Sequence, residues 1–173
     1  MATVTGLRER PRGRVDVELD GAPWRTLPAV AVVRSGLQVG RALDRPTART
    51  LARELRRADA LRVATRALRH RDLSRRALAE RLPVRAREEA LDALERSGYI
   101  DDVRTASSRA ASLAERGFGD EAIRFRLEQE GFSGAAVEQA VAALEPEPER
   151  ARGLLAAGRT ERWLAARGFA PEP

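Results

Sequence analysis

The sequence predicts a mainly α protein: tandem three-helix repeats form an elongated helical array behind a small N-terminal β-hairpin region. The first supporting observation is the signature Leu-x-x-x-Gly-aromatic, which closes four helix-like runs. Glycine adopts the left-handed conformation that ends a helix, and the next apolar residue then folds back onto the leucine one turn earlier. The second observation is that these runs resemble one another, as repeats do. The predicted helix stops, with positive φ, are Gly98, Gly117, Gly131 and Gly168.

The first fifty residues differ from the rest and favour a β-hairpin. Residues 15–19 alternate apolar with acidic side chains, which is the period of a half-buried strand. Asp20-Gly21 is a favoured two-residue turn, and Trp24–Leu27 suits the returning strand. We expect Val4–Leu7 to add an edge strand and Ala29–Ser35 to form a short helix or strand. Because a hairpin alone is marginal in water, it should pack on the helix that follows.

That helix begins near Pro46 and changes phase along its length. Leu51 and Leu55 share one side, yet the same helical wheel places the arginines beyond residue 60 on that side too. One uninterrupted amphipathic helix does not satisfy both halves. We therefore expect a break near Ala58, with Asp59 capping a second helix that runs to about residue 70.

From this point the helices are predicted to come in threes. The run that Ser74 opens superimposes on the run that begins at Gly119, a shift of 45 residues, and Ser133 is expected to open a later helix. The helices are short, so they must bury their leucines against one another. The predicted organisation is a β-hairpin with a helix extension over 1–57, a first three-helix unit over 58–101, a second over 102–145 and a truncated third over 146–173.

The composition leaves little for catalysis. The chain has no cysteine and one histidine, so thiolate chemistry is excluded and histidine chemistry is nearly so. Asp101-Asp102 is better explained by helix capping than by a metal site, because acids are favoured where a helix begins. Trp24 and Trp163 are expected to pack against helices rather than to stack on bases. We expect no catalytic residue, no metal and no cofactor.

No apolar run reaches the roughly 18 residues of a membrane span, and the first fourteen residues contain no apolar signal core. The expectation is a cytoplasmic protein, a monomer, that makes no membrane contact. Aromatic residues make up only 4% of the chain, which argues against one thick core.

Positive charge is concentrated in one stretch. Residues 49–76 contain ten arginines and three acidic residues, a net charge of +7, whereas the whole chain carries +6. A concentrated basic stretch is typical of a protein that binds a polyanion or an acidic groove, although a solvated helix face has the same composition. The chain contains arginine but no lysine, which codon bias explains better than a physical need for guanidinium.

Within this stretch we predict one binding patch. Arg62, Arg66 and Arg69 have the spacing of a single helix face, and Arg75 and Arg76 on the following helix would extend it. Arginine pairs with carboxylate or phosphate through a planar fork, so such a face suits an acidic partner or a nucleic-acid backbone. Ion pairing with acids of neighbouring helices is the alternative explanation.

Two motifs carry a resemblance to a known family. Gly-Tyr-x-Asp-Asp occupies 98–102 and Arg-Gly-Phe-Gly occupies 116–119, after a Leu-Ser at 73–74. At this spacing they resemble the RecX family, bacterial regulatory proteins of the RecA recombinase, and the resemblance covers 58–169.

The resemblance implies a regulator with no chemistry of its own, active in recombination, DNA repair and the SOS response. Such proteins lie along the groove of the recombinase filament on single-stranded DNA and lower its ATPase, strand-exchange and co-protease activities. The alternative from the residues is sequence-independent binding of single- or double-stranded nucleic acid by the arginine-rich face. A helix-turn-helix transcription factor is disfavoured, because repeated units provide no single recognition helix.

Overall fold

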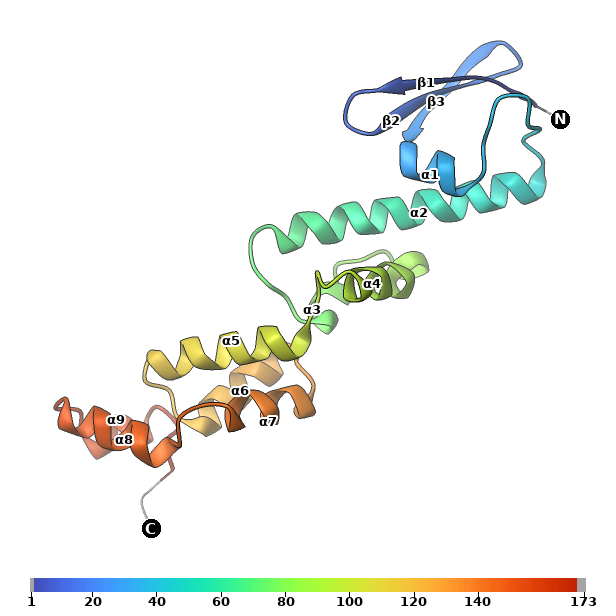
Figure 1. Ribbon diagram of the computed structural model, residues 1–173. Helices are drawn as coiled ribbons and strands as arrows, with labels where there is room; N and C mark the ends of the chain where they lie inside the picture. Colours follow the sequence, from blue (N-terminus) through green and yellow to red (C-terminus); the bar gives the residue numbers. More distant parts are fainter. Residues whose placement is uncertain (1, 171–173) are drawn as a thin grey trace. The chain divides into compact units, whose positions relative to one another are not determined.

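The computed structural model describes residues 2–170 and confirms a mainly helical fold with a small N-terminal sheet (Figure 1). Residues 171–173, which end the predicted third unit, lie outside the described residues. The elements are β1 Val4–Arg10, β2 Arg14–Leu19, β3 Ala22–Pro28, α1 Ala29–Arg34, α2 Arg45–Leu68, α3 Arg75–Ala79, the 3-10 helix η1 Val84–Ala86, α4 Arg87–Arg96, α5 Asp102–Glu115, α6 Asp120–Gln129, α7 Gly134–Ala142, α8 Glu147–Ala156 and α9 Glu161–Ala165.

The chain divides into two compact units. The first unit consists of Met1–Arg66 with Leu82–Asp92, and the second of Ala67–Arg81 with Ala93–Pro173. The sheet, α1 and most of α2 belong to the first unit, and α5 to α9 belong to the second. The predicted repeat bounds concern the recurrence of helices rather than compactness, and they stay predictions.

The predicted hairpin is confirmed and lies within a three-stranded antiparallel sheet of order β1-β2-β3. Asp20 and Gly21 form its two-residue turn with φ of 49° and 82°, the positive values that such a turn requires. The edge strand β1 is longer than predicted, because its pairing with β2 continues to Arg10 opposite Arg14. The remaining segment, 29–34, is a helix.

The apolar face of the sheet packs on α1 and α2, as predicted. Leu51 of α2 is buried in this core and Leu55 packs against its edge. The buried members of the core are Val4, Val15, Val17, Leu27, Val32, Leu37 and Leu51.

The predicted break near Ala58 is wrong, because α2 is one continuous helix. Its first half buries Leu51, whereas its second half buries Ala60 and Ala64. Leu51 and Ala60 are about two and a half turns apart and therefore lie on opposite sides of the helix. The phase change in the sequence marks a change of buried face, which a straight helix accommodates. Asp59 does not cap a helix but pairs with Arg62, 2.7 Å away.

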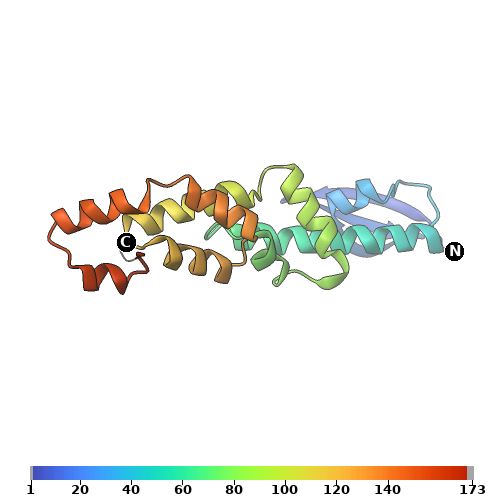
Figure 2. The ribbon, with the colours of Figure 1, turned by 90° about the horizontal axis from the view of Figure 1, so that it is seen from below.

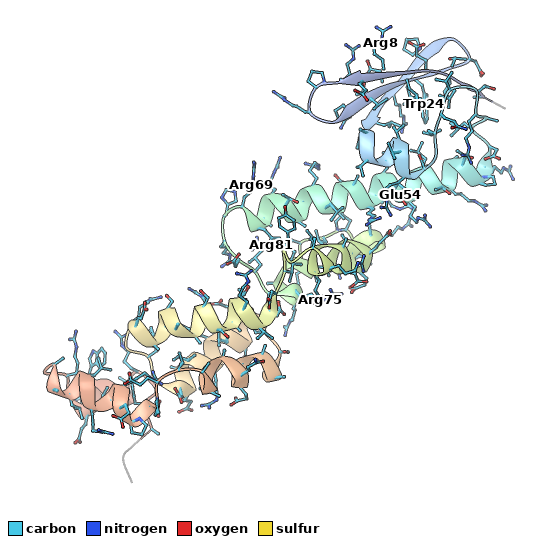
Figure 3. The ribbon with its side chains drawn as sticks, viewed as in Figure 1. Arg8, Trp24, Glu54, Arg69, Arg75 and Arg81 are labelled. Atoms are coloured by element: carbon cyan, nitrogen blue, oxygen red, sulfur yellow. The ribbon has the colours of Figure 1, made fainter. Side chains whose placement is uncertain are left out.

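One buried acid ties three helices of the first unit together. Glu54 of α2 is 3% exposed and accepts a hydrogen bond from Arg34 Nε of α1 at 2.8 Å (Figure 3). A second arginine joins α4 to this acid: Arg57 Nη1 lies 3.9 Å from Glu54 Oε2 and 3.5 Å from Glu89 Oε1 of α4. Burial by itself raises the pKa of Glu54, but the hydrogen bonds and charges of Arg34 and Arg53 outweigh it, so the pKa is lowered.

All four predicted helix stops are confirmed. Gly98, Gly117, Gly131 and Gly168 have φ between 72° and 87°. After each glycine the next N–H donates to the leucine carbonyl five residues back, as in Phe118 to Leu113 at 3.2 Å. The glycine N–H donates to the carbonyl three residues back, which completes a Schellman turn. Each short helix thus ends with its last carbonyls satisfied.

The aromatic residue does not play the same part at every stop. The three phenylalanines after Gly117, Gly131 and Gly168 are buried, but Tyr99 is 65% exposed and Ile100, 3% exposed, is the buried residue there. The same turn also ends α1 at Gly36-Leu37 and α8 at Gly158-Arg159. These two lack the aromatic residue, which is why the signature did not find them.

Helices α5, α6 and α7 pack around one core in the second unit, and the chain then reverses between α8 and α9 (Figure 2). Ser74 and Ser133 cap α3 and α7 as predicted, each accepting a backbone N–H at its side-chain oxygen. The buried residues of this core are Ala106, Ala110, Leu113, Phe118, Ile123, Leu127, Phe132, Ala136, Val137, Ala140 and Val141.

A helix stop and a helix start of the second unit touch backbone to backbone. The N–H of Gly119 donates to the carbonyl of Arg167 at 2.9 Å. A Cβ on Gly119 would overlap the backbone of Gly168, and a Cβ on Gly168 would lie 2.7 Å from Ala122 Cβ. Only hydrogen atoms fit at this contact, which explains a glycine on each side of it.

The Glu54→Gln variant tests the buried acid. We expect it to lower the free energy of unfolding by about 3 kcal/mol at pH 7, because it leaves Arg34 and Arg57 without their carboxylate. The folded-state pKa of Glu54 is lowered, so its stabilisation is present above the ordinary glutamate value of about 4.3 and is lost as pH falls through the folded pKa. Urea denaturation of wild type and variant, at neutral and acidic pH, measures both effects.

The control is Glu80→Gln, because Glu80 is 70% exposed in its pair with Arg76. It should change the free energy of unfolding by less than about 0.5 kcal/mol. A Glu54→Gln loss that stays constant down to acidic pH would contradict the role of its charge.

The Gly119→Ala variant tests the close contact. Gly119 has φ of −78°, which any residue adopts, so the cost is purely steric. We expect a loss of about 3 kcal/mol in urea denaturation, because the added methyl group has no space. Gly134→Ala is the matched control, since a Cβ there meets nothing within 4 Å, and it should gain up to about 1 kcal/mol. Equal stabilities of the two variants would refute the contact.

Candidate partner-binding surfaces

The predicted arginine patch begins on the second half of α2. Arg62 and Arg66 are one turn apart and exposed, and Arg69 follows the end of the helix, also exposed (Figure 3). Arg62 pairs with Asp59, whereas Arg66 and Arg69 belong to none of the ion pairs found among residues 2–170. The common face predicted for these three arginines stays a prediction, since α2 ends at Leu68, one residue before Arg69.

The other two predicted residues lie on α3 and differ from each other. Arg75 is half-buried and pairs with Glu95 at 2.7 Å, so its side chain takes part in packing the second unit. Arg76 is 73% exposed and lies 3.7 Å from Glu80. Arg62 and Arg66 belong to the first unit and the other three to the second, so a single patch of all five stays a prediction.

Asp101 and Asp102 have separate structural roles. Asp101 is the N-cap of α5 and accepts the Arg104 N–H at 2.9 Å. Asp102 accepts the Arg75 N–H at the start of α3, at 2.8 Å, and burial raises its pKa. Among residues 2–170, no three His, Cys, Asp or Glu side chains gather as a potential metal site.

The bond from Arg75 to Asp102 recurs 45 residues further along the chain. There the N–H of Asp120, the first residue of α6, donates to Glu147, the first residue of α8, at 2.5 Å. In both places an acid that opens one helix caps the start of an earlier helix. The predicted shift of 45 residues thus corresponds to a repeated hydrogen bond.

The helix stops complete the same junctions. Ser74 donates from its hydroxyl to the Glu130 carbonyl at 2.7 Å, just before the Gly131 stop. Gly119, which corresponds to Ser74, receives the stop at Gly168 in the contact described above. Each junction therefore places a helix stop against a helix start.

The outer face of the sheet carries a polar hollow of about 400 Å³. Trp24, which is 37% exposed, lines this hollow together with Arg8, Arg10 and Arg25 (Figure 3). The guanidinium carbon of Arg25 lies 5.5 Å from the centroid of the Trp24 indole. Trp24 therefore lies at the surface of the sheet, whereas packing against helices was predicted. Arg10 pairs with Asp16 across the strands.

A cluster of arginines and aromatic rings in the second unit was missed by sequence reasoning. Phe118 has three guanidinium carbons within 6 Å of its ring centroid: Arg126 at 4.2 Å, Arg167 at 4.8 Å and Arg116 at 5.7 Å. Arg167 also lies 4.6 Å from the Trp163 centroid. The available signal was the tripeptide Arg-Gly-Phe, which occurs at 116–118 and again at 167–169.

Trp163, predicted to pack against helices, contacts the helix stop at Gly117 that follows α5. A Cβ on Gly117 would lie 2.8 Å from the Trp163 ring, so the glycine stop also makes room for the indole.

None of the helices in residues 2–170 combines the length and apolar character that a membrane crossing requires.

Comparison with known proteins identifies the fold. No protein-family model and no curated protein matches the chain. Among solved structures, the crystal structure of the regulatory protein RecX matches with a TM-score of 0.82, covering 98% of this chain and 95% of that chain, at 21% identity. At this identity the likeness concerns the fold. The chain therefore has a RecX-like fold, as the resemblance of the motifs implied.

Variants at Asp102 test the junction. Asp102→Ala should lower the free energy of unfolding by about 1–3 kcal/mol, because the Arg75 N–H loses its acceptor. Asp102→Asn keeps an oxygen acceptor without burying a charge, so we expect it to equal or exceed wild type at pH 7. Thermal and urea denaturation of both variants distinguish acceptor from charge.

The pH dependence follows from the raised pKa of Asp102. A raised folded-state pKa gives a contribution that is full below the ordinary aspartate value of about 3.9 and is lost as pH rises through the folded pKa. Asp102→Asn should therefore gain on wild type as pH rises toward 7. The control is Glu145→Gln, because Glu145 is exposed. An equal gain in the free energy of unfolding by this control, as pH rises, would exclude the explanation.

Proposed function

Because the chain has the RecX fold along nearly its whole length, we propose that it is a regulator that binds the RecA recombinase filament on DNA. It lowers the ATPase, strand-exchange and co-protease activities of the filament and catalyses no reaction itself. The observation that carries the proposal is the match over 98% of this chain and 95% of the RecX chain.

The motif residues support the proposal independently of overall shape. In the first motif, Gly98 is the stop that follows α4, Asp101 caps the start of α5, and Asp102 accepts the first N–H of α3. In the second motif, Gly117 is the stop that follows α5, and Gly119 leaves room for the helix stop at Gly168. The residues that resemble the family are therefore the residues that build the helix junctions of this chain.

The exposed arginines of α2 are the proposed contact with the filament. Arg62 and Arg66 share a helix face, and Arg69 continues its spacing just past the helix end. Arg62 and its neighbour Asp59 are 61% and 52% exposed, so their ion pair contributes little and a partner can replace it. Guanidinium groups so placed fit carboxylates of the recombinase or phosphates of its DNA.

The Arg62→Gln, Arg66→Gln, Arg69→Gln triple variant tests this surface. We expect it to fold with unchanged thermal stability. The concentration that half-inhibits RecA ATPase on single-stranded DNA should rise at least about tenfold, since three charge-assisted contacts disappear. A matched variant with Gln at Arg85, Arg104 and Arg152, exposed arginines elsewhere, should inhibit like wild type. Full inhibition by the folded triple variant would remove this surface from the function.

The proposed function itself has a separate test. Wild-type protein should co-sediment with the recombinase filament and slow its ATPase at a salt concentration where it does not bind bare DNA. A protein that binds bare DNA with a steep salt dependence and leaves filament ATPase unchanged would instead be a phosphate-binding protein.

A further inference from the structure

The arginine and aromatic residues of the second unit form one connected cluster around two rings. Arg167 lies between the rings, over both Phe118 and Trp163, and Arg159 lies 4.9 Å from the Trp163 centroid. We call this set the arginine–aromatic cluster: Arg116, Arg126, Arg159 and Arg167 with Phe118 and Trp163.

These four arginines lack the acidic partners that their neighbours have. Arg124 of the same α6 helix pairs with Glu138 at 2.9 Å, and Arg150 of α8 pairs with Asp120. In the part of the chain that the structure describes, no carboxylate forms an ion pair with any of the four cluster arginines. Four cations gathered around two rings repel one another, and a bound anion would relieve that repulsion.

The cluster is held in place by the fold rather than by flexible side chains alone. Arg167 donates to the Arg116 carbonyl at 3.2 Å, which links the ends of α5 and α9. Trp163 rests on the bare Cα of Gly117, and Phe118 is 9% exposed. The rings fix the guanidinium planes, so less rotamer entropy is lost when an anion binds.

We propose that the arginine–aromatic cluster binds the sugar-phosphate backbone of nucleic acid, without sequence preference. A nucleic-acid strand carries a phosphate on every nucleotide, so it meets several guanidiniums at once whatever its sequence. Guanidinium carbons lie 4.2 Å from the Phe118 centroid and 4.6 Å from the Trp163 centroid, so a nucleic-acid base would compete with an arginine for the ring, which favours phosphate over base as the main contact. An acidic polypeptide would need an unbroken run of carboxylates to match the same cluster.

This binding requires no recombinase, so it goes beyond the proposed function. It also lies on α6, on α9 and in the loops that flank α5 and α9, whereas the sequence placed nucleic-acid binding on the stretch 49–76. The two locations make opposite predictions for the same measurement.

The measurement is fluorescence anisotropy of a labelled oligothymidine, about 30 nucleotides long, with the full chain over a series of NaCl concentrations. Arg126→Gln with Arg167→Gln should weaken binding at least about tenfold and reduce the salt slope of log K by about 2, one for each lost phosphate contact. A second double variant, Arg116→Gln with Arg159→Gln, changes two exposed residues and should have the same effect on DNA binding. It replaces the first double variant in the measurement if that one fails to fold.

The matched control replaces Arg124 and Arg152, which pair with Glu138 and Glu149 on α7 and α8. It should bind within about twofold of wild type, because these guanidiniums are already neutralised. The α2 triple variant should bind DNA like wild type. Loss of DNA binding in the α2 variant with retention in both folded cluster pairs would overturn the proposal.

Two further outcomes decide the partner class. Labelled poly-glutamate that binds wild type more tightly than the oligothymidine would overturn the proposal in favour of an acidic protein. Filament ATPase is measured on the same variants. Inhibition that persists when a cluster pair no longer binds DNA supports two separate surfaces, whereas wild type that binds DNA but never inhibits refutes only the proposed function.

Discussion

The left-handed glycines that end α5, α6, α8 and α9 are the constraint on which the rest of the second unit depends. A helix of ten residues does not hold together alone in water, so each must end where its last carbonyls are satisfied and its partners are within reach. Gly117 and Gly131 satisfy the carbonyls through Schellman turns and send the following phenylalanine into the core. The stop therefore decides helix length, chain direction and burial together.

Glycine has a second role at the junctions between helices. Gly119 and Gly168 allow two chain segments to approach more closely than any side chain would permit, and a recurring acid then caps the neighbouring helix start. Junctions built from backbone contacts and buried hydrogen bonds resist slippage, because a shift of one residue would leave polar groups unsatisfied.

Arginine has three distinct roles in this chain, and its surroundings separate them. Around buried Glu54 it neutralises an acid and joins three helices. At Arg75 it packs a junction, with a side chain that is mostly covered. At Arg62, Arg66 and Arg69 and around Phe118 it faces solvent or a ring, and its ion-pair partner among the described residues is an exposed acid or none.

The sequence by itself determined the local structure: helix stops, caps and the hairpin depend on backbone conformations that glycine, serine and Asp-Gly favour wherever they occur. It also found the shift of 45 residues and the family resemblance, because both depend on spacing along the chain. The continuity of α2 was decided by tertiary packing, since Ala60 and Ala64 are buried on a second face that no single helical wheel reveals. The arginine–aromatic cluster was decided in the same way. Arg116 and Arg167 are 51 residues apart, and only the packing of α9 against the end of α5 brings them to one ring.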